Sequence, residues 1–134
     1  MSKSDKDPRA RIELTDSPDE IRDKIRKAVS DCTSNITYDP EGRPGISNLI
    51  ELHSAFTGLT PEEICEESLH LDTLAYKNVV ADVLIEHLKP IREKIIKLKT
   101  DPLYLVQRLD AGSERAKQIA GPTYESVRQM IGCR

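Results

Sequence analysis

Apolar residues recur at helical spacing over most of this 134-residue chain, starting just after Ser17. Residues 17–20, Ser-Pro-Asp-Glu, have the spacing of a capping box, with proline at the first helical position and acids near the positive end of the helix dipole. The apolar residues that follow share one helical face and are Ile21, Ile25, Ala28 and Val29. We therefore predict an amphipathic helix that begins at Ser17 and is basic on its outer face.

Residues 31–45 are dense in turn-forming residues, and we expect an ordered loop there. A second helical stripe follows, made of Ile46, Leu49, Ile50, His53 and Phe56. Gly58 should end that helix, because glycine readily adopts the left-handed conformation common after a helix. Residues 60–63, Thr-Pro-Glu-Glu, predict the start of a short third helix.

A long apolar pattern begins near Asp72 and continues for roughly seven turns, which predicts a long helix. Its main apolar face carries Leu74, Ala81, Leu84, Leu88, Ile91, Ile95 and Leu98. Pro90 should kink or split this helix, because proline removes a backbone donor and its ring clashes with the preceding turn. Ile85 and Ile96 fall on the opposite side, so we expect the helix to be central or to dock another domain.

A further helix should open at residues 101–102, Asp-Pro. We expect residues 111–112, Ala-Gly, to interrupt it, Ser113 to cap the segment that follows, and residues 121–122, Gly-Pro, to produce a second kink. Only residues 11–15 alternate as a strand would, and they are too few to form a sheet alone. The expected fold class is therefore all-α, a helical bundle.

The overall charge argues weakly against nucleic-acid binding, because the formal net charge is -3. The distribution of charge is more informative, since residues 51–76 contain acids but no lysine or arginine, whereas residues 89–99 are strongly basic. Cations are favoured near a helix C-terminus in any case, so a solvated basic face explains the second cluster without a ligand. We expect a molecule with an acidic end and a basic end.

Several kinds of site are not indicated by the residues. The three cysteines form no CxxC pair, and the three histidines are too scattered to bind a metal together. The acidic run at residues 62–67 fits ordinary compensation of a helix dipole better than a cation site. The sequence contains no apolar run of membrane-spanning length and no recognisable catalytic constellation. We therefore expect no metal site, no membrane segment and no independent enzyme.

The first five residues, Met-Ser-Lys-Ser-Asp, place a lysine between two hydroxyl residues, a pattern suited to binding phosphate oxygens. They are followed by Arg-Ile-Glu-Leu-Thr-Asp-Ser-Pro at residues 11–18. This succession resembles the KMSKS region of bacterial and mitochondrial tryptophanyl-tRNA synthetases, which are class I enzymes. The resemblance continues over essentially the whole chain, through residues 37–49, 57–59, 76–82, 90–92 and 109–127.

The resemblance implies an ATP-dependent ligase that activates tryptophan and transfers it to tryptophan tRNA. Lys3 would bind the ATP phosphates and stabilise charge in the transition state, an electrostatic role. Ser2 and Ser4 would support the loop, Met1 would lie near adenine, and Mg²⁺ would accompany ATP as a substrate. No tightly bound cofactor is implied. The first lysine of the motif, the nucleotide-binding fold and the tryptophan pocket are not among these 134 residues, so we expect the isolated chain to be inactive.

The resemblance also implies two parts, with residues 1–16 forming the KMSKS loop and the end of a Rossmann-type catalytic domain. Residues 17–134 would form the helical domain that recognises the anticodon end of tRNA. From helical geometry, the cations expected to contact tRNA phosphates are Lys89, Arg92 and Lys97, with Arg108 and Arg115 as secondary candidates. The full-length enzyme would be a homodimer, with ATP and tryptophan bound through its catalytic domain.

Residues 36–48 are closer to animal mitochondrial members of the family, which suggests the mitochondrial matrix; a bacterial origin would imply the cytoplasm instead. Two alternatives stay open at the level of sequence. One is a helical adaptor that binds proteins, with the Met-Ser-Lys-Ser start arising by coincidence. The other is a tyrosyl-type synthetase, because the KMSKS motif is shared across class I.

Overall fold

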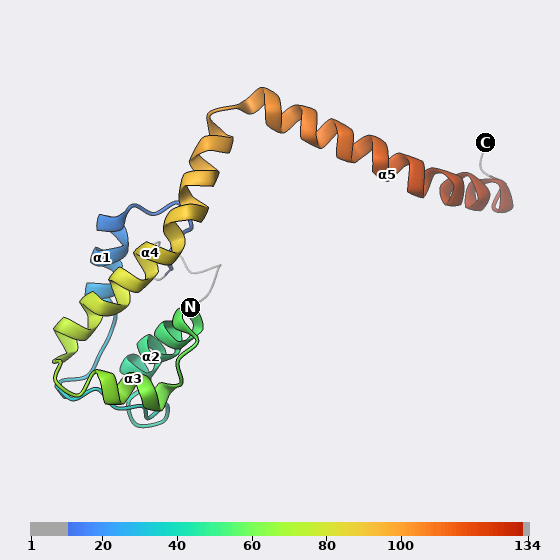
Figure 1. Ribbon diagram of the computed structural model, residues 1–134. Helices are drawn as coiled ribbons and strands as arrows, with labels where there is room; N and C mark the ends of the chain where they lie inside the picture. The colour runs from blue at the N-terminus through green and yellow to red at the C-terminus, as the bar shows by residue number, and fades with distance from the viewer. Residues whose placement is uncertain (1–10, 133–134) are drawn as a thin grey trace. The chain divides into compact units, whose positions relative to one another are not determined.

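The computed structural model describes residues 11–132, and every regular element in that range is a helix (Figure 1). The elements are α1 (Pro18–Lys27), α2 (Pro44–Thr57), α3 (Pro61–Glu67), α4 (Thr73–Lys99) and α5 (Pro102–Met130). The expected all-α fold is therefore confirmed. The chain divides into two compact units, which we call unit 1 (Met1–Glu93) and unit 2 (Lys94–Arg134).

The predicted helix ends are confirmed where the local chemistry is strongest. Ser17 and Glu20 form the capping box of α1, and Thr60 and Glu63 form that of α3. In both boxes the glutamate accepts hydrogen bonds from the backbone and hydroxyl of the cap residue, and these bonds lower the pKa of Glu20 and of Glu63. Gly58 ends α2 with φ of 78°, in the left-handed region predicted for it.

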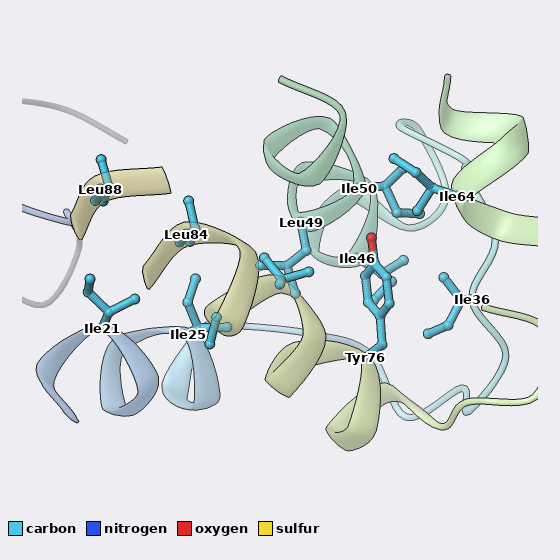
Figure 2. Close-up of a cluster of buried hydrophobic side chains, with 12 residues drawn as sticks. Ile21, Ile25, Ile36, Ile46, Leu49, Ile50, Ile64, Tyr76, Leu84 and Leu88 are labelled. Atoms are coloured by element: carbon cyan, nitrogen blue, oxygen red, sulfur yellow. The ribbon is translucent and has the colours of Figure 1, made fainter. Parts of the chain in front are cut away.

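The core of unit 1 lies where α1, α2, α3 and the first part of α4 meet (Figure 2). Its apolar members come from all four helices and from the loop before α2, and they are Ile21, Ile25, Ile36, Ile46, Leu49, Ile50, Ile64, Tyr76, Val80, Ala81, Leu84 and Leu88. The predicted stripes are confirmed for Ile21 and Ile25 of α1 and for Ile46, Leu49 and Ile50 of α2, and His53 is buried beside them. Ala28 and Phe56 are only partly buried. Val29 is 85% exposed, contrary to prediction, because α1 ends at Lys27 and the backbone of Ala28 is already extended.

The buried face of α4 differs partly from the prediction. Ala81, Leu84 and Leu88 are buried as expected, but Leu74 and Ile91 are 54% and 44% exposed. The buried row instead runs through positions four residues apart: Tyr76, Val80, Leu84, Leu88 and Arg92. The amphipathic residues Tyr76 and Arg92 belong to this row because each buries an apolar body and finds a hydrogen-bond partner for its polar end.

Both long helices, α4 and α5, are continuous over their lengths. Pro90 lies inside α4, which continues on both sides of it, so the helix is not split. Likewise α5 runs through Gly112 and Pro122 without interruption, and Ser113 is an internal residue rather than a cap. A glycine such as Gly112 costs only about 1 kcal/mol in a helix interior. Its neighbours are mostly strong helix formers, which explains why the helix continues.

No side chain of α5 is buried. The large apolar residues exposed on it include Leu103, Leu105, Val106, Leu109, Ile119, Tyr124, Val127 and Met130. Within residues 11–132, none of the helices combines the length and the apolar character needed to cross a lipid bilayer.

Candidate nucleic-acid interface

The residues expected to bind ATP, Met1, Ser2, Lys3 and Ser4, lie outside the described residues. The described chain begins just after them, at residue 11, and leads through Asp16 into α1. The candidate tRNA contacts, by contrast, all lie on the described parts of α4 and α5.

Arg92 holds the segment that leads into α1. Its Nη1 donates to the backbone oxygen of Asp16 at 3.0 Å, and the residue is only 9% exposed. The Asp16 carboxylate accepts from Lys24 Nζ at 2.5 Å and from the backbone nitrogen of Glu13 at 2.8 Å. The prediction that Arg92 points to solvent as a tRNA contact is therefore wrong, because it continues the buried row of Leu88 rather than the outer basic face.

The other four candidate cations, Lys89, Lys97, Arg108 and Arg115, are exposed. None of them forms an ion pair with another described residue. By contrast, Lys117 and Arg128 on α5 lie 3.9 Å and 3.7 Å from glutamates three residues before them. The side chains of these four candidates are therefore available to bind an external anion.

Lys77 closes the C-terminal end of α1. Its Nζ donates to the backbone oxygen of Ala28 at 2.7 Å and to that of Arg26 at 3.3 Å. Carbonyls in the last turn of a helix lack partners within the helix, so the ammonium satisfies groups that would otherwise be exposed or unpaired. Burial lowers the pKa of Lys77. Together with the contact of Arg92, this bond sets α1 and the first part of α4 side by side in opposite directions.

Arg43 organises the loop before α2, a role that we did not predict from the sequence. Its guanidinium forms a two-point contact with Asp31, with N–O distances of 2.8 Å and 2.7 Å. It also donates to the Thr37 hydroxyl at 2.6 Å and to the backbone oxygens of Asn35 and Thr33 at 2.7 Å and 3.1 Å. The hydrogen bonds from Arg43 lower the pKa of Asp31 to about 2. Five donated bonds from one side chain give this irregular segment a defined shape.

The organised loop is also joined to the helices beside it. Thr73, the first residue of α4, donates its hydroxyl to the backbone oxygen of Thr33 at 3.0 Å. At the other end of the loop, the Ser47 hydroxyl of α2 accepts from the backbone nitrogen of Asp39 at 3.0 Å. The expectation of an ordered loop at residues 31–45 is therefore confirmed.

A pocket of about 300 Å³ opens between this loop and the start of α4. Its lining consists of Ser30, Asp31, Cys32, Thr33 and Ser34 from the loop side and Asp72, Thr73, Leu74 and Lys77 from the α4 side. Sequence analysis missed this pocket, because its two walls are forty residues apart along the chain. The clustering of hydroxyl residues at 30–34 was the one signal available.

His53 is a structural residue of the core, as expected for an isolated histidine. Its Nδ1 lies 3.3 Å from the hydroxyl of Tyr76 inside the core. Burial lowers the pKa of His53 and raises the pKa of Tyr76. Within the part of the chain that the structure describes, no three acidic, histidine or cysteine side chains gather closely enough to bind a metal ion.

This arrangement of helices and the sequence that forms it define the class of protein. Residues 1–89 match the family model described as tRNA synthetases class I (W and Y). The chain belongs to that family. Among similar proteins with curated names, the tryptophan–tRNA ligase of Thermosynechococcus vestitus is 36% identical over 132 residues, which are 98% of this chain and 40% of the relative. The mitochondrial tryptophan–tRNA ligase of Dictyostelium discoideum is also 36% identical, over 98% of this chain and 35% of its own length.

The fold is shared with a solved structure, the tryptophanyl-tRNA synthetase of Mycoplasma pneumoniae, with a TM-score of 0.68. That chain is 22% identical, and the match covers 98% of the present chain and 40% of the other. The present chain thus spans about two-fifths of the length of the relatives it matches. The family model covers both the tryptophan and the tyrosine enzymes and gives no support to the adaptor alternative. The curated relatives named above are of the tryptophan type and give no support to the tyrosyl alternative.

Proposed function

We propose that this chain is part of an ATP-dependent tryptophan–tRNA ligase and that its helices contribute tRNA recognition. The observation that carries the proposal is the family match over residues 1–89, combined with tryptophan–tRNA ligases that align with 98% of the chain. Within this proposal, residues 1–16 belong to the ATP-binding part and residues 17–134 form the helical recognition domain. The complete enzyme would act as a homodimer, with tryptophan bound in its catalytic domain.

The proposed ATP loop consists of Met1, Ser2, Lys3 and Ser4. The ammonium of Lys3 would stabilise the negative charge that develops on the phosphates when tryptophan attacks, and Mg²⁺ bound with ATP would share that task. Such stabilisation requires that both substrates be held in register with the loop. The chain alone should therefore give no tryptophan-dependent exchange of pyrophosphate into ATP, and measurable exchange would overturn this part of the proposal.

The proposed phosphate contacts are the four exposed cations, Lys89, Lys97, Arg108 and Arg115. Arg92 is not retained, because its guanidinium is occupied by the Asp16 carbonyl. Each cation that neutralises a phosphate releases condensed counterions. The slope of log Kd against log salt therefore reports the number of phosphate contacts.

The test is a salt titration of tryptophan tRNA with the wild-type chain and with a variant in which the four cations are replaced by glutamine. If all four contact phosphates, the slope of log Kd against log salt should fall by about 3, because each contact contributes about 0.7–0.9. A matched control replaces Lys117 and Arg128, exposed cations of α5 that lie near glutamates. Equal slopes for the quadruple variant and the wild type would refute these contacts.

The mitochondrial matrix is our proposed location, supported by the mitochondrial relative in Dictyostelium discoideum and by the resemblance of residues 36–48. A fluorescent fusion of the complete natural protein tests it. Accumulation in the matrix is expected, and a purely cytoplasmic signal would contradict it.

A further inference from the structure

We propose that the pocket between the Arg43-held loop and the start of α4 binds one unstacked nucleobase of the tRNA and favours a base with an exocyclic amino group. This inference rests on the proposed function and extends it to a particular site. Three features of unit 1 support it: the rigidity of the pocket, the chemistry of its lining and its place along α4.

The walls of the pocket are held before any ligand arrives. Arg43 fixes one wall through Asp31 and the Thr33 carbonyl, and Thr73 donates to the same carbonyl from the other wall. A preformed site avoids the entropic cost of ordering a loop on binding. The pocket volume of about 300 Å³ is at the lower end of the range of small-molecule sites, which is adequate for a single base.

The lining suits a base edge better than a phosphate. It combines hydroxyl groups with the carboxylates of Asp31 and Asp72, and its single cation, Lys77, already donates to two backbone carbonyls. The carboxylate of Asp31 is occupied by Arg43, whereas Asp72 uses only Oδ1, which accepts from the backbone nitrogen of Ala75 at 2.7 Å. Among the described residues, no partner occupies Asp72 Oδ2. A carboxylate oxygen accepts from the exocyclic amino group of cytosine, adenine or guanine, which uracil lacks, and repels phosphate.

Leu74 gives the pocket an apolar surface on which a base could lie. It belongs to the lining, and 54% of it is exposed although it sits in the first turn of α4. Placing a base against it would remove apolar surface from water, which is favourable and independent of base identity. Leu74 would thus contribute affinity, while Asp72 would contribute selectivity.

The pocket also lies far along α4 from Arg92, which holds Asp16, the residue before the cap of α1. From Arg92 to Asp72 the chain follows α4 for twenty residues, or about 30 Å at 1.5 Å per residue. In the proposed function Asp16 ends the ATP-binding part, so a base bound here would belong to a part of the tRNA remote from the point where that part joins the helical domain. Unpaired loop bases are the part of an RNA that proteins read most readily by their edges.

The test measures the affinity of the complete chain for tryptophan tRNA transcripts that differ at one anticodon-loop base at a time. The key variant is Asp72→Ser, because serine caps a helix about as well as aspartate but lacks the carboxylate. Asp82→Ser is the matched control, since Asp82 is an exposed acid of the same helix that pairs with Arg22 outside the pocket. Urea unfolding of both variants shows whether the fold is kept.

We expect the wild type to prefer a base with an exocyclic amino group over uracil at one loop position by about tenfold, a modest value for one specific base contact. Asp72→Ser should lose the preference at that position alone, Asp82→Ser should retain it, and Leu74→Ala should weaken binding of every transcript. Unchanged base preference in Asp72→Ser, with RNA binding intact, would overturn the pocket while leaving the proposed function in place. Failure of the wild-type chain to bind any transcript would overturn both.

Discussion

Arg92 is a buried cation that stabilises the segment before α1. It lies within a basic run, yet it is buried and donates to the backbone oxygen of Asp16. Periodicity places a residue on a helix face but does not tell which side of a broad apolar stripe meets the core. A long arginine with an apolar stem can occupy either side.

Arg92→Ala should destabilise the chain by about 2 kcal/mol, because the buried carbonyl of Asp16 loses its charged donor. Urea unfolding measures this effect. Lys89→Ala is the control, and it should change stability by less than about 0.5 kcal/mol, as is usual for an exposed site. Equal stabilities of the two variants would contradict the structural role of Arg92.

His53 should make the stability of unit 1 depend on pH. Burial lowers the pKa of His53 below its ordinary value of 6.5, so the unfolded chain takes up the proton more readily than the folded one. The contribution of His53 is therefore fully present above about pH 6.5 and is lost as the pH falls below it. Urea unfolding should show a loss of stability between about pH 7.5 and about pH 5, a range that spans the ordinary histidine pKa of 6.5.

The variant His53→Gln separates this effect from other titrations. It should be less stable than the wild type at neutral pH but should show a flatter dependence on pH across that range. His70→Gln, at an exposed histidine, should keep the dependence of the wild type. If His53→Gln lost as much stability on acidification as the wild type, another group would be responsible.

Gly45 in α2 and Gly112 in α5 differ in how much space surrounds them. In α2, a Cβ added at Gly45 would lie 2.5 Å from the backbone oxygen of Val29, which cannot move without shifting the chain. In α5, a Cβ added at Gly112 would meet nothing within 4 Å. Gly45 thus permits the close approach of α2 to the end of α1, whereas Gly112 has no packing role in this chain.

We therefore expect opposite effects from the same substitution. Gly112→Ala should increase the helix content of α5 and stabilise it by about 0.5–1 kcal/mol, the ordinary difference between glycine and alanine. Gly45→Ala should be destabilising by about 1–3 kcal/mol, as other overpacking substitutions are. Circular dichroism and thermal unfolding measure both. A stabilising Gly45→Ala would show that the approach of α2 is looser than described.

Among the helices, the ends were predicted most accurately where they depend on local sequence and no tertiary contact opposes it. The capping boxes at Ser17 and Thr60 and the left-handed Gly58 follow from neighbouring residues alone, and all are found as predicted. The interruption predicted at Gly112 is absent, because a long run of helix formers outweighs one unfavourable residue. The Arg43 network could not be predicted, since its acceptors are two side chains and two backbone carbonyls whose positions depend on the folded loop.

At the scale of the whole molecule, the two units differ in how they are stabilised. Unit 1 has a core to which four helices contribute, whereas α5 buries no side chain. Helices in water depend mainly on tertiary packing for their stability. In this chain alone, the amides of α5 should exchange with solvent much faster than those of α2, and hydrogen exchange read by mass spectrometry measures this. Protection of α5 equal to that of α2 would show that its apolar face is covered in solution.

We propose that these helices recognise tryptophan tRNA, and such recognition requires binding that depends on the anticodon. The measurement is a titration of the chain with tryptophan tRNA and with an anticodon-altered transcript, at low and at physiological salt, because phosphate contacts alone weaken steeply as salt rises. We predict that both RNAs bind at low salt and that the native anticodon keeps a clear advantage at physiological salt. Equal affinity for the two RNAs at physiological salt, or no binding of either, would contradict the claim.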